Sequence, residues 1–239
     1  MLITATALKN TVPTLLPARA AALASHADFI LPKYGIDSPD ILHEFIANVA
    51  HESGAFRLKE ENLNYKNPAR LVAIWPSRFT TMEKIRSLKL AVSIADIVKR
   101  KVLIPQLEKE QGKASAEAYA GEPRKIANLV YGSRMGNHLP DDGWNMRGGG
   151  FAQLTGREMY EAYRRWTGHK TTESVAECVR TDDWWAMDSA AWFFSKAKGL
   201  VSLSKGSANL PAIVTRWNGG LIGWTERQYY YERAKTYIY

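Results

Sequence analysis

Apolar residues recur every three to four positions along most of this chain, whereas the alternating runs that signal β-strands are scarce and short. The clearest such segment begins at Ser38, a favourable N-cap, and continues with Pro39, which suits the first helical position. Gly54, a typical helix terminator, follows an apolar stripe of Ile41, Leu42, Phe45, Ile46 and Val49. We therefore expect a mainly α-helical fold, in which this helix carries His51 and Glu52 at its C-terminal end.

The same periodicity predicts further helices at 82–101, around 126–130, at 159–166, at 188–198 and after Gly223. Pro105 should end the helix at 82–101, because proline lacks the N–H that an inner helical position needs. One face of that helix gathers Ile85, Leu88, Val92, Ala95, Val98 and Val102. Residues 132–150 are rich in glycine and predict a long loop, a kind of segment that is often functional, and 202–207 predict a short polar connector.

A chain of 239 residues, 46% of them hydrophobic, can bury a substantial core. We expect one domain over 1–239, in which about 76–120 form a basic helical insertion or small lobe. The single cysteine, Cys178, is expected to be a buried small side chain. The first 30 residues lack the pattern of a signal peptide, and no segment is apolar enough over ~18 residues to span a membrane. We therefore expect synthesis in the cytoplasm, with a monomer as the default.

The chain carries 32 lysines and arginines against 24 aspartates and glutamates, a net charge of +8. Between residues 84 and 113 eight basic residues stand against three acidic ones, so this stretch holds +5 of the total. Such a balance indicates an anionic partner, whether nucleic acid, a membrane surface or a charged wall polymer. The segment 84–113 is either a solvated helix face or a surface for an anionic lipid or wall polymer, and no nucleic-acid-binding module accompanies it.

Two carboxylates are candidates for glycosidic chemistry. Glu52 ends the helix that starts at Pro39, and Glu61 follows nine residues later in a run with Asn62, Asn64 and Tyr65. Glycoside hydrolysis commonly takes one protonated carboxyl to assist the leaving oxygen and one ionised carboxylate to activate water or attack. A helix end followed by a loop can place two such groups across a groove, although glutamate pairs at this spacing are also common without function.

Other reaction classes find less support in the sequence. His43-Glu44 and His51-Glu52 look like parts of a zinc motif, but the metalloprotease pattern needs a second histidine four residues after the first, where Ala47 stands. No Gly-x-Ser-x-Gly nucleophile elbow occurs, and the glycine run 148–150 is not followed by the lysine of a phosphate-binding loop. We therefore expect neither a metal nor a cofactor.

Amide and aromatic side chains beside glycines are candidates for sugar contacts. Gln153 and Thr155 follow the glycine run directly, where the backbone can approach a ligand closely, and Asn218 precedes Gly219 and Gly220. Trp144 and Trp217 have rings that can stack on sugars. The alternatives are that the amides satisfy backbone groups and that the tryptophans belong to the core.

Together these motifs resemble the family 19 glycoside hydrolases, chitinase-like enzymes, and most closely their bacteriophage endolysin branch. The matching blocks run in the right order from about residue 41 to 227: His51–Phe56, Glu61–Tyr65, Asn128–Tyr131, Arg134–Asn137, Asp142–Gly156 and Trp217–Gly220. The resemblance implies a mostly α-helical, two-lobed, lysozyme-like domain with a cleft between the lobes. It also implies an inverting mechanism without metal, so we expect 1–239 to be a single catalytic domain with no separate cell-wall-binding module.

Carried over by position, Glu52 is the general acid, Glu61 the general base, and Thr155 the hydroxyl that helps to hold the attacking water. The substrate-binding positions are filled by His51, Tyr65, Trp144, Arg147, Gln153, Trp217 and Asn218. An inverting enzyme needs its carboxyls about 6.5–9.5 Å apart to admit a water. A general acid must hold its proton, so we expect Glu52 in the drier place, where desolvation raises its pKa.

The chain departs from the family pattern at Gly149, where an arginine is usual, at Lys66, where a serine is common, and in the long basic stretch from about 83 to 117. The leading hypothesis is an endolysin that cleaves the glycan strands of peptidoglycan as an N-acetylmuramidase, accumulates in the host cytoplasm and reaches the wall through a holin. A chitinase, an antibacterial peptidoglycan-hydrolase effector, a basic nucleic-acid-binding protein and an inactive carbohydrate-binding relative are the alternatives.

Overall fold

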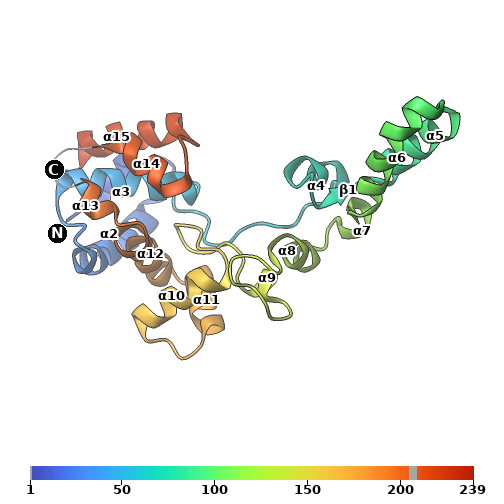
Figure 1. The fold of residues 1–239 in the computed structure, drawn as a ribbon. Helices are drawn as coiled ribbons and strands as arrows, with labels where there is room; N and C mark the ends of the chain where they lie inside the picture. The colour runs from blue at the N-terminus through green and yellow to red at the C-terminus, as the bar shows by residue number, and fades with distance from the viewer. Residues whose placement is uncertain (1, 205–208) are drawn as a thin grey trace. The chain divides into compact units, whose positions relative to one another are not determined.

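Helices dominate residues 2–204 and 209–239, the part of the chain that the computed structural model describes (Figure 1). The predicted mainly α-helical class is therefore confirmed. Within these residues no helix is both long enough and apolar enough to cross a membrane. The chain forms two compact units: unit 1 comprises Met1–Glu61 and Asn145–Tyr239, and unit 2 comprises Asn62–Trp144.

Unit 1 holds the larger core, built from helices of both its segments. The first segment contributes α1 (Ala5–Thr11), α2 (Pro17–Ile30), the 3₁₀ turn η1 (Leu31–Tyr34) and α3 (Pro39–Glu52). The second contributes α10 (Arg157–Thr167), α11 (Thr172–Thr181), α12 (Asp183–Trp192), the π-helical turn η2 (Phe193–Ala197), α13 (Leu200–Ser204), α14 (Leu210–Asn218) and α15 (Trp224–Tyr237). Helix α3 packs most extensively against α15, so the C-terminal helix covers the one that carries His51 and Glu52.

Helix α3 forms as the sequence predicts. Ser38 is its N-cap residue and Pro39 its first helical residue, although the serine side chain makes no capping hydrogen bond. Its apolar stripe is buried in the unit 1 core, and the polar Glu44 and Asn48 are buried as well. The helix ends at Glu52, and Gly54 follows with a positive φ of 55°.

Unit 2 has its own small core and a minimal sheet. Its elements are α4 (Pro68–Ile74), β1 (Phe79–Thr80), α5 (Met82–Ile94), α6 (Ile97–Gln111), β2 (Ala114–Ser115), α7 (Ala116–Tyr119) and α8 (Pro123–Tyr131), while α9 (Asp142–Asn145) ends one residue beyond it. β1 and β2 pair in parallel, with Phe79 opposite Ala114. The core gathers Leu63, Leu71, Phe79, Ala116, Ile126, Ala127 and Val130.

The single helix predicted at 82–101 is wrong, because the structure has a hairpin of two helices there. Helix α5 ends at Ile94, and α6 runs on from Ile97 through Pro105 to Gln111. The Asp96 side chain accepts a hydrogen bond from the Lys99 N–H at 2.9 Å and so starts a new helix, and the Arg100 side chain caps α5 by donating to the Val92 carbonyl at 3.1 Å. Proline is tolerated inside α6 on an exposed face, where only one backbone hydrogen bond is given up.

Two loop predictions also need correction. The predicted connector 202–207 is helical over 202–204, within α13, and its last three residues lie outside the described part of the chain. The predicted loop 132–150 is irregular over most of its length but contains the short helix α9. The helices expected around 126–130, at 159–166 and after Gly223 correspond to α8, α10 and α15, and that at 188–198 begins five residues earlier as α12 and continues into η2.

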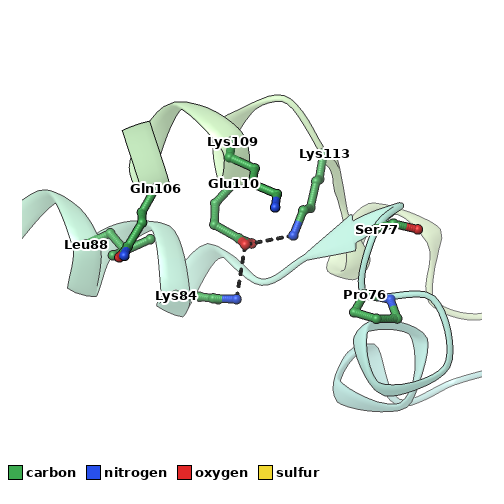
Figure 2. Close-up of a pocket in the computed structure, with 8 residues that line it drawn as sticks. All are labelled: Pro76, Ser77, Lys84, Leu88, Gln106, Lys109, Glu110 and Lys113. Atoms are coloured by element: carbon green, nitrogen blue, oxygen red, sulfur yellow. Dashed lines mark hydrogen bonds and ion pairs between the residues drawn. The ribbon is translucent and has the colours of Figure 1, made fainter. Parts of the chain in front are cut away.

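A buried carboxylate ties the base of the α5–α6 hairpin to the rest of unit 2. Glu110, 7% exposed, accepts hydrogen bonds from the Thr80 hydroxyl and the Lys113 ammonium, each at 2.7 Å, and pairs with Lys84 at 3.1 Å. Figure 2 shows Lys84 of α5 and Lys113 converging on this carboxylate. Burial by itself would raise the pKa of Glu110, but these partners outweigh it and lower the pKa to about 2.

Candidate active site

The carboxylate of Glu52 is held by a buried arginine from the C-terminal helix. Arg227 of α15, 1% exposed, donates through Nη2 to Oε1 of Glu52 and through Nη1 to Oδ1 of Asn48 at 2.6 Å. Its Nε donates to the Ile222 carbonyl at 3.1 Å. Asn48 lies one helical turn before Glu52 in α3, so one guanidinium binds two side chains on the same helix face. The Glu52 side chain remains 22% exposed.

His51 is anchored by the same end of α15. Its Nδ1 lies 2.7 Å from Oε2 of Glu226, and its ring lies against Gly223, the N-cap residue of α15. A Cβ at position 223 would come within 2.2 Å of the ring, and Gly223 has a φ of 70°, so only glycine fits there. The start of α15 therefore fixes both His51 and Glu52.

Glu61 is fixed differently, by backbone pairing with the glycine run. Its N–H donates to the Gly148 carbonyl at 3.0 Å, and its Oε2 accepts from the Gly148 N–H at 3.3 Å. The neighbouring Glu60 forms an antiparallel bridge with Gly149, which in turn pairs with Leu154. Glu61 thus lies on a short pleated patch whose other members come from 148–154.

The same patch positions Gln153 and Thr155. A Cβ at Gly148 would lie 2.8 Å from Oε1 of Gln153 and 3.3 Å from Oε2 of Glu61, so both side chains crowd the same glycine. Gln153 has a φ of 53°, and its amide donates to the Gly150 carbonyl at 3.1 Å. The Thr155 hydroxyl donates to the Gln153 carbonyl at 2.9 Å, which leaves its oxygen able to accept a hydrogen bond. The structure therefore brings the Glu61 and Gln153 side chains together at Gly148, while the Thr155 hydroxyl is placed by the Gln153 carbonyl.

Position 149 has no room for a side chain. A Cβ there would lie 2.4 Å from the Tyr160 hydroxyl oxygen and 2.8 Å from Cγ of Arg180. Tyr160 is fully buried, which raises the pKa of its hydroxyl to about 12, and that hydroxyl donates to the Arg147 carbonyl at 3.1 Å. In the resembled family an arginine is usual at this position. In this chain the Tyr160 and Arg180 side chains fill the space beside the Gly149 backbone, so no side chain fits there.

Three predicted substrate contacts have structural partners in unit 1. Arg147, 7% exposed, pairs with Glu60, with its Nη2 2.5 Å from the carboxylate. Trp217 is 5% exposed and packs edge to face against Phe193, so little of its ring is available to a sugar. The Asn218 side chain accepts from the Gly220 N–H at 3.1 Å and donates to the Ile222 carbonyl at 3.3 Å, which shapes the loop before α15.

Tyr65 and Trp144 belong to unit 2. Tyr65 packs edge to face on Trp75, with ring centroids 5.4 Å apart. The backbone N–H of Trp144 donates to the Asn128 side chain at 2.8 Å, and the Trp144 ring packs on the unit 2 core. Their contact with substrate stays a prediction.

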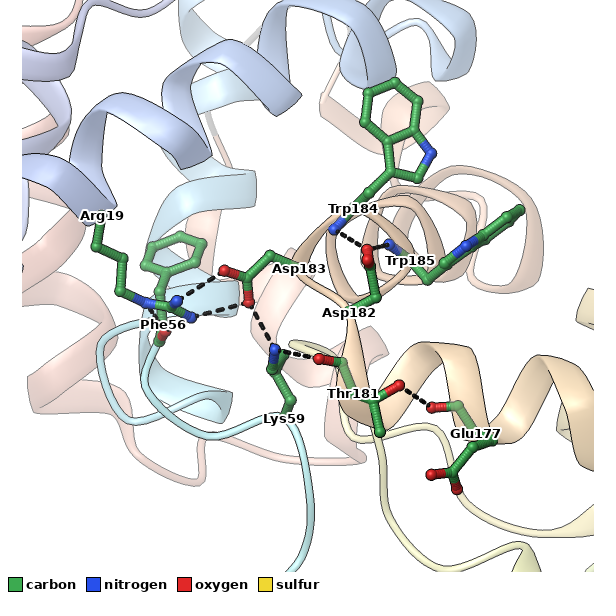
Figure 3. A network of polar contacts seen from close by, with 9 residues as sticks. All are labelled: Arg19, Phe56, Lys59, Glu177, Thr181, Asp182, Asp183, Trp184 and Trp185. Carbon is green, nitrogen blue, oxygen red and sulfur yellow. Dashed lines mark hydrogen bonds and ion pairs between the residues drawn. The ribbon is translucent and has the colours of Figure 1, made fainter.

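A polar network fixes the chain between the two glutamates (Figure 3). Arg19 of α2 donates to the Phe56 carbonyl and pairs with Asp183 at 2.7 Å. Lys59 pairs with the same aspartate at 3.0 Å and donates to the Thr181 carbonyl at 2.7 Å. Burial opposes ionisation of Asp183, but Arg19 and Lys59 outweigh it and hold its pKa below the usual value. The loop that leads to Glu61 is thereby tied to α2 and α12.

Sequence reasoning missed the residues that hold the site. Arg227, Glu226, Asn48 and Glu60 make the contacts to Glu52, His51 and Arg147 described above. One signal was present: Asn48 lies four residues before Glu52, on the same face of a helix whose other buried positions are mainly apolar. Among the described residues, no three His, Cys, Asp or Glu side chains gather closely enough to hold a metal ion.

Comparison with family models gives no match. A curated protein of Haemophilus influenzae, named as a glycosyl hydrolase family 19 domain-containing protein, is 30% identical to this chain over 186 residues. The alignment covers 77% of this chain and 72% of that protein.

Proposed function

Because this chain belongs to glycosyl hydrolase family 19 and is a glycoside hydrolase, we propose that Glu52 and Glu61 are its catalytic pair and that peptidoglycan is its substrate. Glu52 first takes up a proton in place of its ion pair with Arg227, and it donates that proton to the glycosidic oxygen as the bond to the anomeric carbon breaks. Glu61 takes a proton from a water that attacks the same carbon from the opposite face, which inverts its configuration. Thr155 accepts a hydrogen bond from that water.

The observation that carries this proposal is the way in which Gly148 positions Glu61 through two hydrogen bonds. Its backbone N–H and its carboxylate both bind Gly148, and the Gln153 side chain lies against the same glycine. A general base for water must be fixed, because misplacement of the attacking oxygen slows the reaction. Glu52 is held from another direction, by Arg227, so each carboxylate has its own support.

Charge favours peptidoglycan over chitin. Peptidoglycan carries carboxylates on its lactyl-peptide arms, whereas chitin is neutral, and this chain has a net charge of +8. On this basis we propose an endolysin that cleaves β-1,4 bonds in the manner of an N-acetylmuramidase. A chitinase acting on N-acetylglucosamine polymers uses the same pair of carboxylates and is the second candidate.

The test is cleavage of purified peptidoglycan and of chitin oligomers, with mass spectrometry of the released ends and NMR of the newly formed anomer. We expect reducing N-acetylmuramic acid with inverted configuration, and its loss in folded Glu52→Gln and Glu61→Gln proteins. Glu232→Gln, at an exposed site on α15, is the matched control and should cleave as the wild type does. Cleavage of neither polymer by folded wild-type protein, or unchanged rates in both catalytic variants, would contradict the proposal.

The endolysin role needs a separate experiment in cells. Expression with and without a co-expressed holin tests the predicted cytoplasmic accumulation and release. Lysis only in the presence of the holin is the expected result. Lysis of neighbouring cells on contact, together with protection of the producing cell, would favour an antibacterial effector instead.

A further inference from the structure

The α5–α6 hairpin ends in a group of exposed apolar side chains, which we call the hairpin tip. Its members are between 60% and 79% exposed: Leu90, Ile94, Ile97, Val98 and Val102. They come from the last turns of α5 and the first turns of α6, and the two helices run side by side (Figure 1). Single exposed apolar residues are common on proteins, but five of them at the end of one hairpin form a group of the kind that marks an interaction surface.

The hairpin tip is distinct from the seam between the two helices. The larger half-buried apolar side chains of the hairpin are Ile85, Leu88, Val92, Leu103 and Leu107, and the half-buried alanines are Ala91 and Ala95. The prediction that Val98 and Val102 share one face of a single helix with Ile85 and Leu88 is wrong, since they lie on a second helix and are exposed, whereas Ile85 and Leu88 are half-buried. The tip therefore contributes little to holding the hairpin together.

Basic side chains surround the tip. Residues 89–102 carry Lys89, Lys99, Arg100 and Lys101 against one acid, Asp96, a local charge of +3. Lys99 pairs with Asp96 at 3.7 Å, and Arg100 caps α5, but Lys89 and Lys101 make no ion pair within the described residues. Exposed apolar side chains next to unpaired lysines are the pattern of elements that lie in the interface of an anionic bilayer.

We propose that the hairpin tip docks onto the surface of an anionic lipid bilayer. The apolar side chains enter the boundary between headgroups and acyl chains, while Lys89 and Lys101 lie among the lipid phosphates. An anionic polysaccharide can neutralise the lysines but offers no hydrocarbon to the apolar side chains. A second copy of the chain would bring one tip of charge +3 against another.

The structure presents the tip in a fixed shape, which lowers the entropy lost on docking. The turn at Ala95 and Asp96 is closed by the Asp96 cap on α6 and by Arg100, which donates to the Val92 and Ser93 carbonyls at 3.1 and 3.2 Å. At the other end of the hairpin, Glu110 joins Lys84 of α5 and Lys113 (Figure 2). The turn between Ile94 and Ile97 is therefore closed by side chains of the hairpin itself.

The test is co-sedimentation of the full-length protein with vesicles of phosphatidylcholine alone or mixed with phosphatidylglycerol. We expect binding to the mixed vesicles that weakens with salt, and a loss of affinity of about tenfold or more in the double variant Ile94→Asn/Ile97→Asn. Leu16→Asn/Phe29→Asn, which changes two exposed apolar residues of unit 1, is the matched control and should bind as the wild type does. Lys89→Gln/Lys101→Gln should reduce both the affinity and the salt dependence.

Three results would overturn the inference: no binding to the mixed vesicles, unchanged binding in the folded Ile94→Asn/Ile97→Asn protein, or self-association that depends on the tip while lipid does not bind. Retention of the tip variants' helix content is checked by far-UV circular dichroism. The inference does not rest on the proposed function, because Glu52→Gln protein should bind vesicles as the wild type does whatever its activity.

Discussion

The Glu52 carboxylate and the Arg227 guanidinium form an ion pair in which the arginine is buried and the glutamate is partly exposed. The same guanidinium binds Asn48, so the pair connects α15 to two successive turns of α3. A buried arginine at this place has a structural cost that apolar packing would avoid. Its position is explained if the orientation of Glu52 matters to the chemistry, which makes Arg227 a positioning residue.

Replacement of this arginine should therefore affect activity and stability together. Arg227→Met leaves the Asn48 amide oxygen and the Glu52 carboxylate without their partner, and we expect a loss of about 2–4 kcal/mol in the free energy of unfolding. We also expect kcat to fall roughly 10²-fold with a smaller change in KM, and Arg227→Lys to recover part of it. Lys235→Met, at an exposed site on the same helix, is the control. Wild-type kcat in folded Arg227→Met protein would exclude the positioning role.

The Asp183 network predicts a specific dependence of stability on pH. The pKa of the Asp183 carboxyl is lowered in the folded protein. Its contribution to the free energy of unfolding is therefore present above 3.8, its pKa in the unfolded chain, and is lost as the pH falls through its pKa in the folded protein. Asp183→Asn should lower the free energy of unfolding by about 1–2 kcal/mol at pH 7, since Arg19 and Lys59 lose their shared partner at a partly exposed site. The difference should shrink below pH 4. Urea unfolding of both proteins from pH 7 to pH 3 measures it, and a constant difference over this range would contradict it.

Glu110 allows the same reasoning to be checked at a single group in unit 2. Its pKa of about 2 in the folded protein lies below the ordinary value of 4.5 because Lys113, Thr80 and Lys84 outweigh the effect of burial. The stabilisation it gives is therefore complete above pH 4.5 and is lost as the pH falls toward 2. Carbon-13 NMR of the glutamate carboxyls should show one signal that titrates near pH 2 and is absent from Glu110→Gln protein. Titration of that signal near pH 4.5 would mean that the three partners do not hold the carboxylate.

How far the sequence predicts this fold depends on the range of the contacts involved. Helix α3 follows from its own apolar stripe and its Pro39 start, because local periodicity and helix-start preferences both act within one segment. The hairpin does not follow from periodicity, because the pattern runs on across Ala95 and Asp96. What ends α5 is the Arg100 side chain, which reaches back eight residues to Val92, together with the Asp96 cap. Proline is an unreliable terminator where the helix is exposed, as Pro105 shows.

In the candidate site, too, the sequence predicts the residues that local motifs mark but not those that depend on contacts between distant parts of the chain. Residue type and motif identify Glu52, Glu61, Gln153 and Thr155, and the structure shows that Glu61 and Gln153 meet at Gly148. Arg227 is 175 residues away from Glu52 in sequence, and a basic residue inside a helix is usually solvated, so nothing local marks it as buried. The reason why Gly149 carries no side chain is equally non-local, since Tyr160 and Arg180 come from α10 and α11.

Gly149 gives the sharpest test of packing around the candidate site. In Gly149→Ala protein the new methyl group lies too close to the Tyr160 hydroxyl and to Cγ of Arg180, and we expect a loss of about 1–3 kcal/mol in the free energy of unfolding. Gly220→Ala, where a Cβ meets nothing within 4 Å, is the matched control and should change stability by less than about 0.5 kcal/mol.

The double variant Gly149→Ala/Tyr160→Phe identifies the source of the strain. Tyr160→Phe alone removes the hydrogen bond to the Arg147 carbonyl and should cost about 1 kcal/mol. In the double variant the oxygen that would lie 2.4 Å from the new carbon is also absent. We therefore expect the double variant to lose at least about 1 kcal/mol less free energy of unfolding than the sum of the losses in the two single variants. Chemical denaturation of the four proteins completes the cycle. Simple additivity would mean that the Arg180 side chain, and not the Tyr160 hydroxyl, excludes a side chain at position 149.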